Sequence, residues 1–71
     1  MDKNRAENIR KYSVYAAIRD ANGMNDSQVS KATGIATSTL SEWKAGTYVP
    51  KVDKLLKIAE ALQVPLEELL A

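Results

Sequence analysis

The chain has 71 residues and a formal net charge of +1, so one small domain is expected and the charge neither requires nor excludes a nucleic-acid partner. It contains no Cys and no His, which removes disulfides, thiolate metal sites, the usual general base and the commonest metal ligand. We therefore expect no cofactor, no metal and no enzymatic activity. The apolar runs are too short for a transmembrane helix and the polar N-terminus is not a signal peptide, so a cytoplasmic protein without a membrane partner is expected.

Helical periodicity dominates the chain, and no segment shows the alternation of a strand. We expect residues 1–8 to be an N-terminal arm or a frayed helix start, and residues 9–71 to form one domain. The first helix is predicted from about Ile9 to Asn22, and Gly23 suits the position after its end. The side chains predicted on its inward face are Tyr12, Tyr15, Ile18 and either Ala21 or Asn22.

A second helix is predicted to end at Thr33, before the helix-stopping Gly34. Either Asn25 or Asp26 can act as its N-cap. Its predicted inward side chains are Val29 and either Ala32 or Thr33.

The third predicted helix begins at Ala36 or Thr37, ends at Gly46, and has two chemically different faces. Leu40 and Trp43 fall on one side, with Ala36 beside them, and form the predicted buried face. Ser38, Ser41, Glu42 and Ala45 fall on the opposite side, with Thr37 at the exposed first turn, so the outward face is mostly short and hydroxyl-bearing. Solvent-facing helices favour longer, better helix formers, so this face is typical of a helix that approaches another surface closely. A face of small residues with no function is the alternative.

A fourth helix is predicted after the loop 47–50, from about Val52 to Leu62. Its apolar stripe is predicted to consist of Val52, Leu55, Leu56, Ala59 and Leu62. A short last helix is predicted with Pro65 in its first turn, where Glu67 and Glu68 suit the positive N-terminal end. The chain is thus predicted to be all-α, with five helices and short connections.

Two short helices joined by a tight turn at Gly34 form a helix-turn-helix, in which Val29 and Leu40 would hold the helices together. The chain also resembles the Xre/Cro/cI-type helix-turn-helix family of phage repressors and bacterial regulators over about residues 15–70. The residues that carry the resemblance are Gly34, Ser38, Ser41, Trp43, Gly46, Pro50, Leu55, Leu56, Ile58, Ala59, Leu62, Val64 and Leu69. It implies a compact five-helix bundle of the lambda repressor-like DNA-binding type, with the helix-turn-helix formed by its second and third helices.

The resemblance implies a sequence-specific transcriptional regulator, in particular a repressor, whose third helix reads the major groove of a double-stranded DNA operator. The implied base-reading residues are Thr37, Ser38, Ser41 and Glu42. Further residues are expected at the DNA backbone: Asn25, Lys31, Thr39, Lys44, Thr47, Tyr48 and Lys51. A homodimer is expected because one short helix contacts few base pairs, and the resemblance places its contact at the last helix with Leu66, Leu69 and Leu70.

Three positions depart from the family pattern. Asp26 stands where the family often has a phosphate-binding Gln, and we expect it to cap the second helix while Asn25 donates to phosphate. Arg19 matches an Arg that the family often pairs with a Glu, but Lys44 stands at that Glu position and becomes available for DNA. Glu42 either accepts a hydrogen bond from cytosine or lies at the rim and repels phosphate, of which we favour the rim.

Two alternatives remain open at this point. The basic residues Lys3, Arg5, Arg10 and Lys11 are expected to be a solvated face, and an arm along DNA is the other interpretation. The whole chain could be a protein-binding adaptor, for instance a partner of a toxin or of another regulator, which the low net charge and Glu42 favour. Salt dependence separates the two functions, because DNA binding weakens steeply as salt rises.

Overall fold

The computed structural model describes residues 11–70, so the arm predicted at residues 1–8 and the helix start predicted at Ile9 lie outside the described residues. The helices of the described part are α2 (Tyr12–Ala21), α3 (Asp26–Thr33), α4 (Thr37–Ala45), α5 (Val52–Leu62) and α6 (Glu67–Leu70). Residues 11–70 contain no strand, which confirms the predicted all-α class. No helix in this range is long and apolar enough to cross a bilayer.

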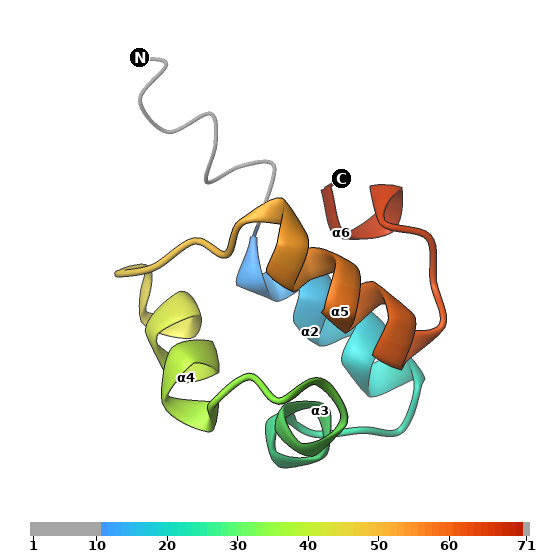
Figure 1. Ribbon diagram of the computed structural model, residues 1–71, viewed down its shortest axis with the longest axis horizontal. Coiled ribbons are helices and arrows are strands. Elements are labelled where there is room, and N and C mark those ends of the chain that lie inside the picture. Colours follow the sequence, from blue (N-terminus) through green and yellow to red (C-terminus); the bar gives the residue numbers. More distant parts are fainter. Residues whose placement is uncertain (1–10, 71) are drawn as a thin grey trace.

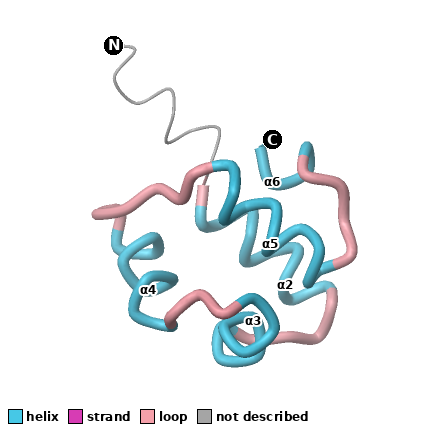
Figure 2. The backbone as a smooth tube through the Cα atoms, in the orientation of Figure 1, coloured by secondary structure: helices cyan, strands magenta, loops and turns pink. Residues whose placement is uncertain are grey.

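The helices enclose one core, with α5 crossing the middle of the molecule (Figure 1). α3 packs against both α5 and α4, and α2 packs against α4 and α6. Short loops join the helices, and the loop between α4 and α5 lies at the outer edge of the molecule (Figure 2). One side of α4 therefore faces out of the bundle.

Every described helix contributes to the core. Val29 and Leu40, predicted to hold the helix-turn-helix together, are 0% and 1% exposed, and Ile35 from the turn between them is also buried. Trp43 is 4% exposed, so it belongs to the core. The remaining buried hydrophobic side chains are Tyr15, Leu55, Ile58, Ala59, Leu62 and Leu69.

The ends of α3 and α4 are set by residues with special backbone or capping properties. Gly34 and Gly46 end the two helices with φ values of 81° and 85°, in the left-handed region that favours glycine. At the start of α3, the Asn25 side chain accepts from the Gln28 N–H and the Gln28 side chain accepts from the Asn25 N–H, each at 2.9 Å. This capping box identifies Asn25, not Asp26, as the N-cap of α3.

The first described helix is shorter than predicted. Lys11 has an extended backbone, with ψ of 137°, so α2 begins at Tyr12 and the prediction of a helix through Lys11 is wrong. Its other end is Ala21, and both Ala21 and the C-cap Asn22 are exposed instead of facing inward. Of the predicted inward side chains, Tyr15 is fully buried, while Tyr12 and Ile18 are partly buried.

The inward face of α5 differs from the predicted stripe. Ile58 is 1% exposed, whereas Val52 and Leu56 are 42% and 45% exposed. The buried residues are Leu55, Ile58, Ala59 and Leu62. They follow the spacing of one helical face, and Leu56 is rotated by about 100° from Leu55, toward solvent.

Two smaller predictions, for Ala36 and Pro65, were also wrong, while the open choice between Ala32 and Thr33 is decided in favour of Thr33. Ala36 is exposed because it is the N-cap of α4, with ψ of 145°, and a helical wheel does not describe its direction. Ala32 is exposed, and Thr33 is the half-buried alternative, with its hydroxyl donating to the Val29 carbonyl at 2.8 Å. Pro65 precedes α6 rather than lying in its first turn, although its carbonyl accepts from the Glu68 N–H at 3.1 Å.

We predict that Leu55→Ala lowers the free energy of unfolding by about 2–5 kcal/mol, because it removes a fully buried side chain. Leu56→Ala is a matched control, since it makes the same change one residue further along α5 at a 45% exposed position. It should cost about 1 kcal/mol or less. Urea denaturation followed by circular dichroism measures both, and equal losses would contradict the inward face of α5.

Candidate nucleic-acid interface

The residues predicted to read bases share one open face of α4. All four side chains are exposed: Thr37, Ser38, Ser41 and Glu42. Leu40 and Trp43, on the opposite side of the same helix, are 1% and 4% exposed. The outward face therefore consists of three hydroxyl side chains and one carboxylate. The buried side chains on the inward face fix the orientation of α4, and with it the direction in which the outward face points.

The backbone-contact residues predicted on α4 and its following loop lie around this face. Lys44 is exposed in the last turn of α4, while Thr39 is half-buried on its flank. In the loop, the Thr47 hydroxyl donates to the Glu42 carbonyl at 3.1 Å, so this side chain helps to close the C-terminal end of α4. Tyr48 is half-buried and packs on the core, and Lys51 is exposed at the N-cap of α5.

Two predicted backbone-contact residues lie at opposite ends of α3. Lys31 is exposed in its last turn. Asn25 is also exposed, but its side-chain oxygen is used in the capping box with Gln28. Its side-chain NH₂ group donates no hydrogen bond within the described residues, and contacts from Asn25 and Lys31 to phosphate stay predictions.

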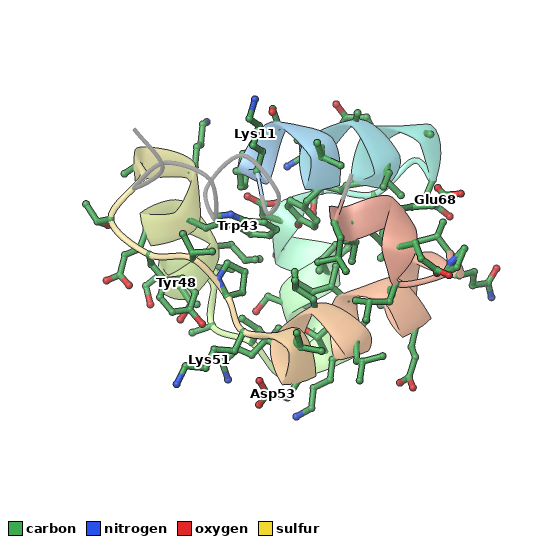
Figure 3. All side chains as sticks on the ribbon, turned by 90° about the horizontal axis from the view of Figure 1, so that it is seen from above. Lys11, Trp43, Tyr48, Lys51, Asp53 and Glu68 are labelled. Carbon is green, nitrogen blue, oxygen red and sulfur yellow. The ribbon has the colours of Figure 1, made fainter. Side chains whose placement is uncertain are left out.

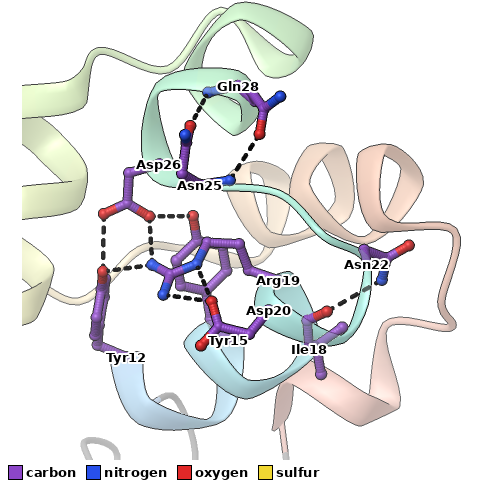
Figure 4. A network of polar contacts seen from close by, with 9 residues as sticks. All are labelled: Tyr12, Tyr15, Ile18, Arg19, Asp20, Asn22, Asn25, Asp26 and Gln28. Atoms are coloured by element: carbon purple, nitrogen blue, oxygen red, sulfur yellow. Dashed lines mark hydrogen bonds and ion pairs between the residues drawn. The ribbon is translucent and has the colours of Figure 1, made fainter.

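A polar network connects α2 to the start of α3 (Figure 4). The Asp26 carboxylate accepts from the hydroxyls of Tyr15 and Tyr12, at 2.6 and 2.8 Å. It also accepts from Arg19 Nη1 at 2.8 Å. The prediction that Asp26 caps α3 was therefore wrong, because all of these bonds run to α2.

Arg19 holds the network together on the α2 side. Besides Asp26, it donates to the Tyr12 hydroxyl at 2.8 Å and to Asp20 Oδ1 at 3.0 and 2.8 Å. Its guanidinium carbon also lies 5.9 and 5.6 Å from the ring centroids of Tyr12 and Tyr15. Arg19 thus pairs with Asp26, whereas the family resemblance implied a partner at the position that Lys44 occupies.

Sequence reasoning missed the Arg19–Asp26 pair, although one pattern could have indicated it. Asn25 followed three residues later by Gln28 is a capping-box spacing, which supplies the N-cap without Asp26. A carboxylate that is not needed as a cap, seven residues after an unpaired Arg, is then available for a tertiary ion pair.

The network fixes the charge of each member. Burial would raise the pKa of Asp26, but hydrogen bonds from Tyr15, Tyr12 and Arg19 outweigh it and hold that pKa below its usual value. Burial and the bond to Asp26 raise the pKa of Tyr15, and the same causes raise that of Tyr12. Bonds to Asp20 and Asp26 raise the pKa of Arg19 despite its burial. Arg19 therefore stays protonated, and Asp20 and Asp26 compensate its positive charge.

The same tyrosines support α4. Tyr15 stacks on Trp43 with ring centroids 5.1 Å apart and an interplanar angle of 29°. Tyr12 meets Trp43 edge-on, at 5.6 Å and 89°. The chain of contacts from Asp26 through the tyrosines to Trp43 therefore couples the start of α3 to the inward face of α4.

We predict that Asp26→Asn lowers the free energy of unfolding by about 1–3 kcal/mol at neutral pH, because three donors lose their charged acceptor. The pKa of Asp26 is lowered in the fold, so its contribution is present above the unfolded value of about 3.9 and lost as pH falls through the folded value. The difference between wild type and variant should therefore shrink below about pH 4.

Urea denaturation at several pH values measures this difference. Asp53→Asn is the matched control, since Asp53 is exposed and forms no ion pair within residues 11–70. It should cost less than about 1 kcal/mol. A difference for Asp26→Asn that stays constant from neutral to acid pH would contradict a charged Asp26 in the network.

The geometry of α3, the turn at Gly34 and α4 is that of a helix-turn-helix, the unit of a large class of DNA-binding regulators. The helix-turn-helix family model matches residues 16–69, and the chain belongs to this Xre/cI-like family. No curated protein and no solved structure matches the chain. The family is one of DNA-binding regulatory domains and not of enzymes, so the chain is a DNA-binding regulator of the helix-turn-helix type.

Proposed function

We propose that this chain is a sequence-specific transcriptional repressor that reads the major groove with α4. The observation that carries the proposal is the exposed face of Thr37, Ser38 and Ser41 on a helix whose other side is locked into the core. Short side chains let the helix axis come close to the base pairs. Hydroxyl groups can both donate to and accept from base edges and phosphates.

The distribution of cations supports the same proposal. Within residues 11–70, ion pairs join Arg19 to Asp20 and Asp26, and none involves a lysine. Lys31, Lys44 and Lys51 are exposed around the helix-turn-helix and are available for phosphate. Each phosphate that they neutralise would release counterions and add a salt-dependent contribution to the binding free energy.

Glu42 has a distinct part in the proposal, because it is the one carboxylate on this face of α4. It is exposed and forms no ion pair within the described residues. We propose that it lies at the rim of the contact, where its charge opposes phosphate and limits non-specific affinity. The competing role, acceptance from a cytosine amino group, would give base preference instead.

A homodimer on a two-fold-symmetric operator is part of the proposal, since one short helix contacts few base pairs. Leu69 is 1% exposed and belongs to the core, so it is not available at the predicted dimer contact. Leu66 and Leu70 are half-buried, and we propose that they form the C-terminal part of this contact.

Selection of binders from a random duplex library, followed by anisotropy titrations of the best duplex at several salt concentrations, tests the function. We expect a two-fold-symmetric motif and an affinity that falls steeply with salt. If no sequence is enriched and no duplex binds even at low salt, the regulator proposal fails. The alternative of a protein-binding adaptor, which the exposed Glu42 favours, then takes its place.

We predict that Ser38→Ala weakens discrimination at one base position of each half-site by about 1 kcal/mol, the lower end of the range for a direct base contact. Its hydroxyl makes no hydrogen bond within the described residues and is exposed, so the melting temperature should not change. Titrations against the selected duplex and its single-base variants measure the effect. If the relative affinities for the single-base variants do not change, Ser38 does not contact a base.

A further inference from the structure

A groove of about 350 Å³ lies where the beginning of α2, the end of α4 and the following loop meet. Residues from all three segments line it, among them Lys11, Ser13, Trp43, Lys44, Tyr48 and Val49. It adjoins the C-terminal end of the reading helix, away from the turn at Gly34. The groove therefore borders the proposed DNA contact without being part of the predicted reading face.

The groove combines an apolar floor with a basic rim. Trp43 is almost fully buried, and Tyr48 and Val49 are half-buried, so their surfaces form a floor. Figure 3 labels Lys11, Trp43 and Tyr48 among these lining residues. Lys11 and Lys44 are exposed at the edge, and neither forms an ion pair within residues 11–70. Among the residues that the structure describes, no carboxylate lines the groove.

These features select an anion that carries apolar groups beside its charge. The carbonyl groups at the end of α4 would repel such an anion. That repulsion is reduced because the Thr47 N–H and hydroxyl both donate to the Glu42 carbonyl, at 3.0 and 3.1 Å. The Gly46 N–H donates to the Trp43 carbonyl at 3.1 Å. The two lysines then leave the groove with a net positive charge.

The sugar–phosphate backbone of DNA has the chemistry that fits, with phosphate for the lysines and deoxyribose for the aromatic floor. Lys44 is also continuous with the reading face, since it follows Ser41 and Glu42 by less than one turn of α4. A duplex on that face would continue past the end of the helix to the groove. Lys11 and Ser13, at the beginning of α2, lie outside residues 16–69, the part of the chain that the family model matches.

We infer that this groove is a backbone-binding subsite for the operator duplex, in which Lys11 and Lys44 bind phosphate from opposite walls. The inference rests on the proposed function and extends the contact to the beginning of α2. It makes Lys11 a DNA-binding residue, in addition to those expected around the helix-turn-helix.

The test uses the full chain, the selected duplex and a scrambled duplex of the same length. Lys11→Ala should weaken binding to both duplexes by the same factor, because phosphate carries no sequence information. It should reduce the slope of log affinity against log salt by about 0.9, so that the loss shrinks about 3.5-fold when salt rises fourfold. Lys44→Ala should do the same.

Lys57→Ala is the matched control, because Lys57 is exposed on α5, forms no ion pair within the described residues and lies outside the groove. It removes the same charge and should leave the slope unchanged. If wild type binds no duplex, the proposed function fails and this inference fails with it. If wild type binds but Lys11→Ala behaves like Lys57→Ala, the groove inference alone is overturned.

A second measurement locates the phosphate. Single phosphates of the selected duplex are replaced by neutral methylphosphonates, and each duplex is titrated with wild type and with Lys11→Ala. At the phosphate bound in the groove, the loss of affinity caused by the methylphosphonate and the loss caused by Lys11→Ala should not add. Each change alone already removes the interaction between Lys11 and that phosphate. Additive losses at every position would overturn the inference even if Lys11→Ala alone weakens binding.

Discussion

The contact between Tyr15 and Trp43 is the interaction on which the rest of the structure depends. Tyr15 is fully buried, and its hydroxyl is held by Asp26 at 2.6 Å while its ring stacks on Trp43. One side chain of α2 therefore fixes both helices of the helix-turn-helix, through a hydrogen bond to α3 and an aromatic contact to α4. In a domain of this size few side chains are available for the core, so combining these contacts in one residue gives α4 a defined orientation.

This arrangement also separates the cations of the chain by role. Arg19 is committed to Asp20 and Asp26, so its charge serves the fold. The lysines have no such partners within the described residues and remain in contact with solvent. Because the exposed face of α4 carries hydroxyls and a carboxylate, attraction to phosphate would come from Lys44 in its last turn and from lysines outside α4, and base contacts and affinity would depend on different residues.

Local rules predicted the helices well because their boundaries are local. Left-handed glycines end α3 and α4, and the spacing of Leu40 and Trp43 is enough to orient α4. The same rules could not decide whether Leu56 or Ile58 is buried. Two overlapping sets of apolar residues on α5 have helical spacing, and the packing of the other helices determines which set faces the core. Nor could local rules place Asp26, whose partners lie 14, 11 and 7 residues earlier in the chain. The groove was unpredictable for the same reason, because its walls meet only in the folded chain.

The pairing of Arg19 with Asp26 has a consequence for how this chain and its family can change by mutation. The family resemblance implies a Glu at the position of Lys44 as the partner of this Arg, whereas in this chain the partner of Arg19 on α3 is Asp26. Changing from one arrangement to the other takes two substitutions, and the intermediate has an acid at both positions or at neither, in addition to Asp20, which already pairs with Arg19. Positions 26 and 44 should therefore covary among homologues, with an acid at one of them accompanying its absence at the other.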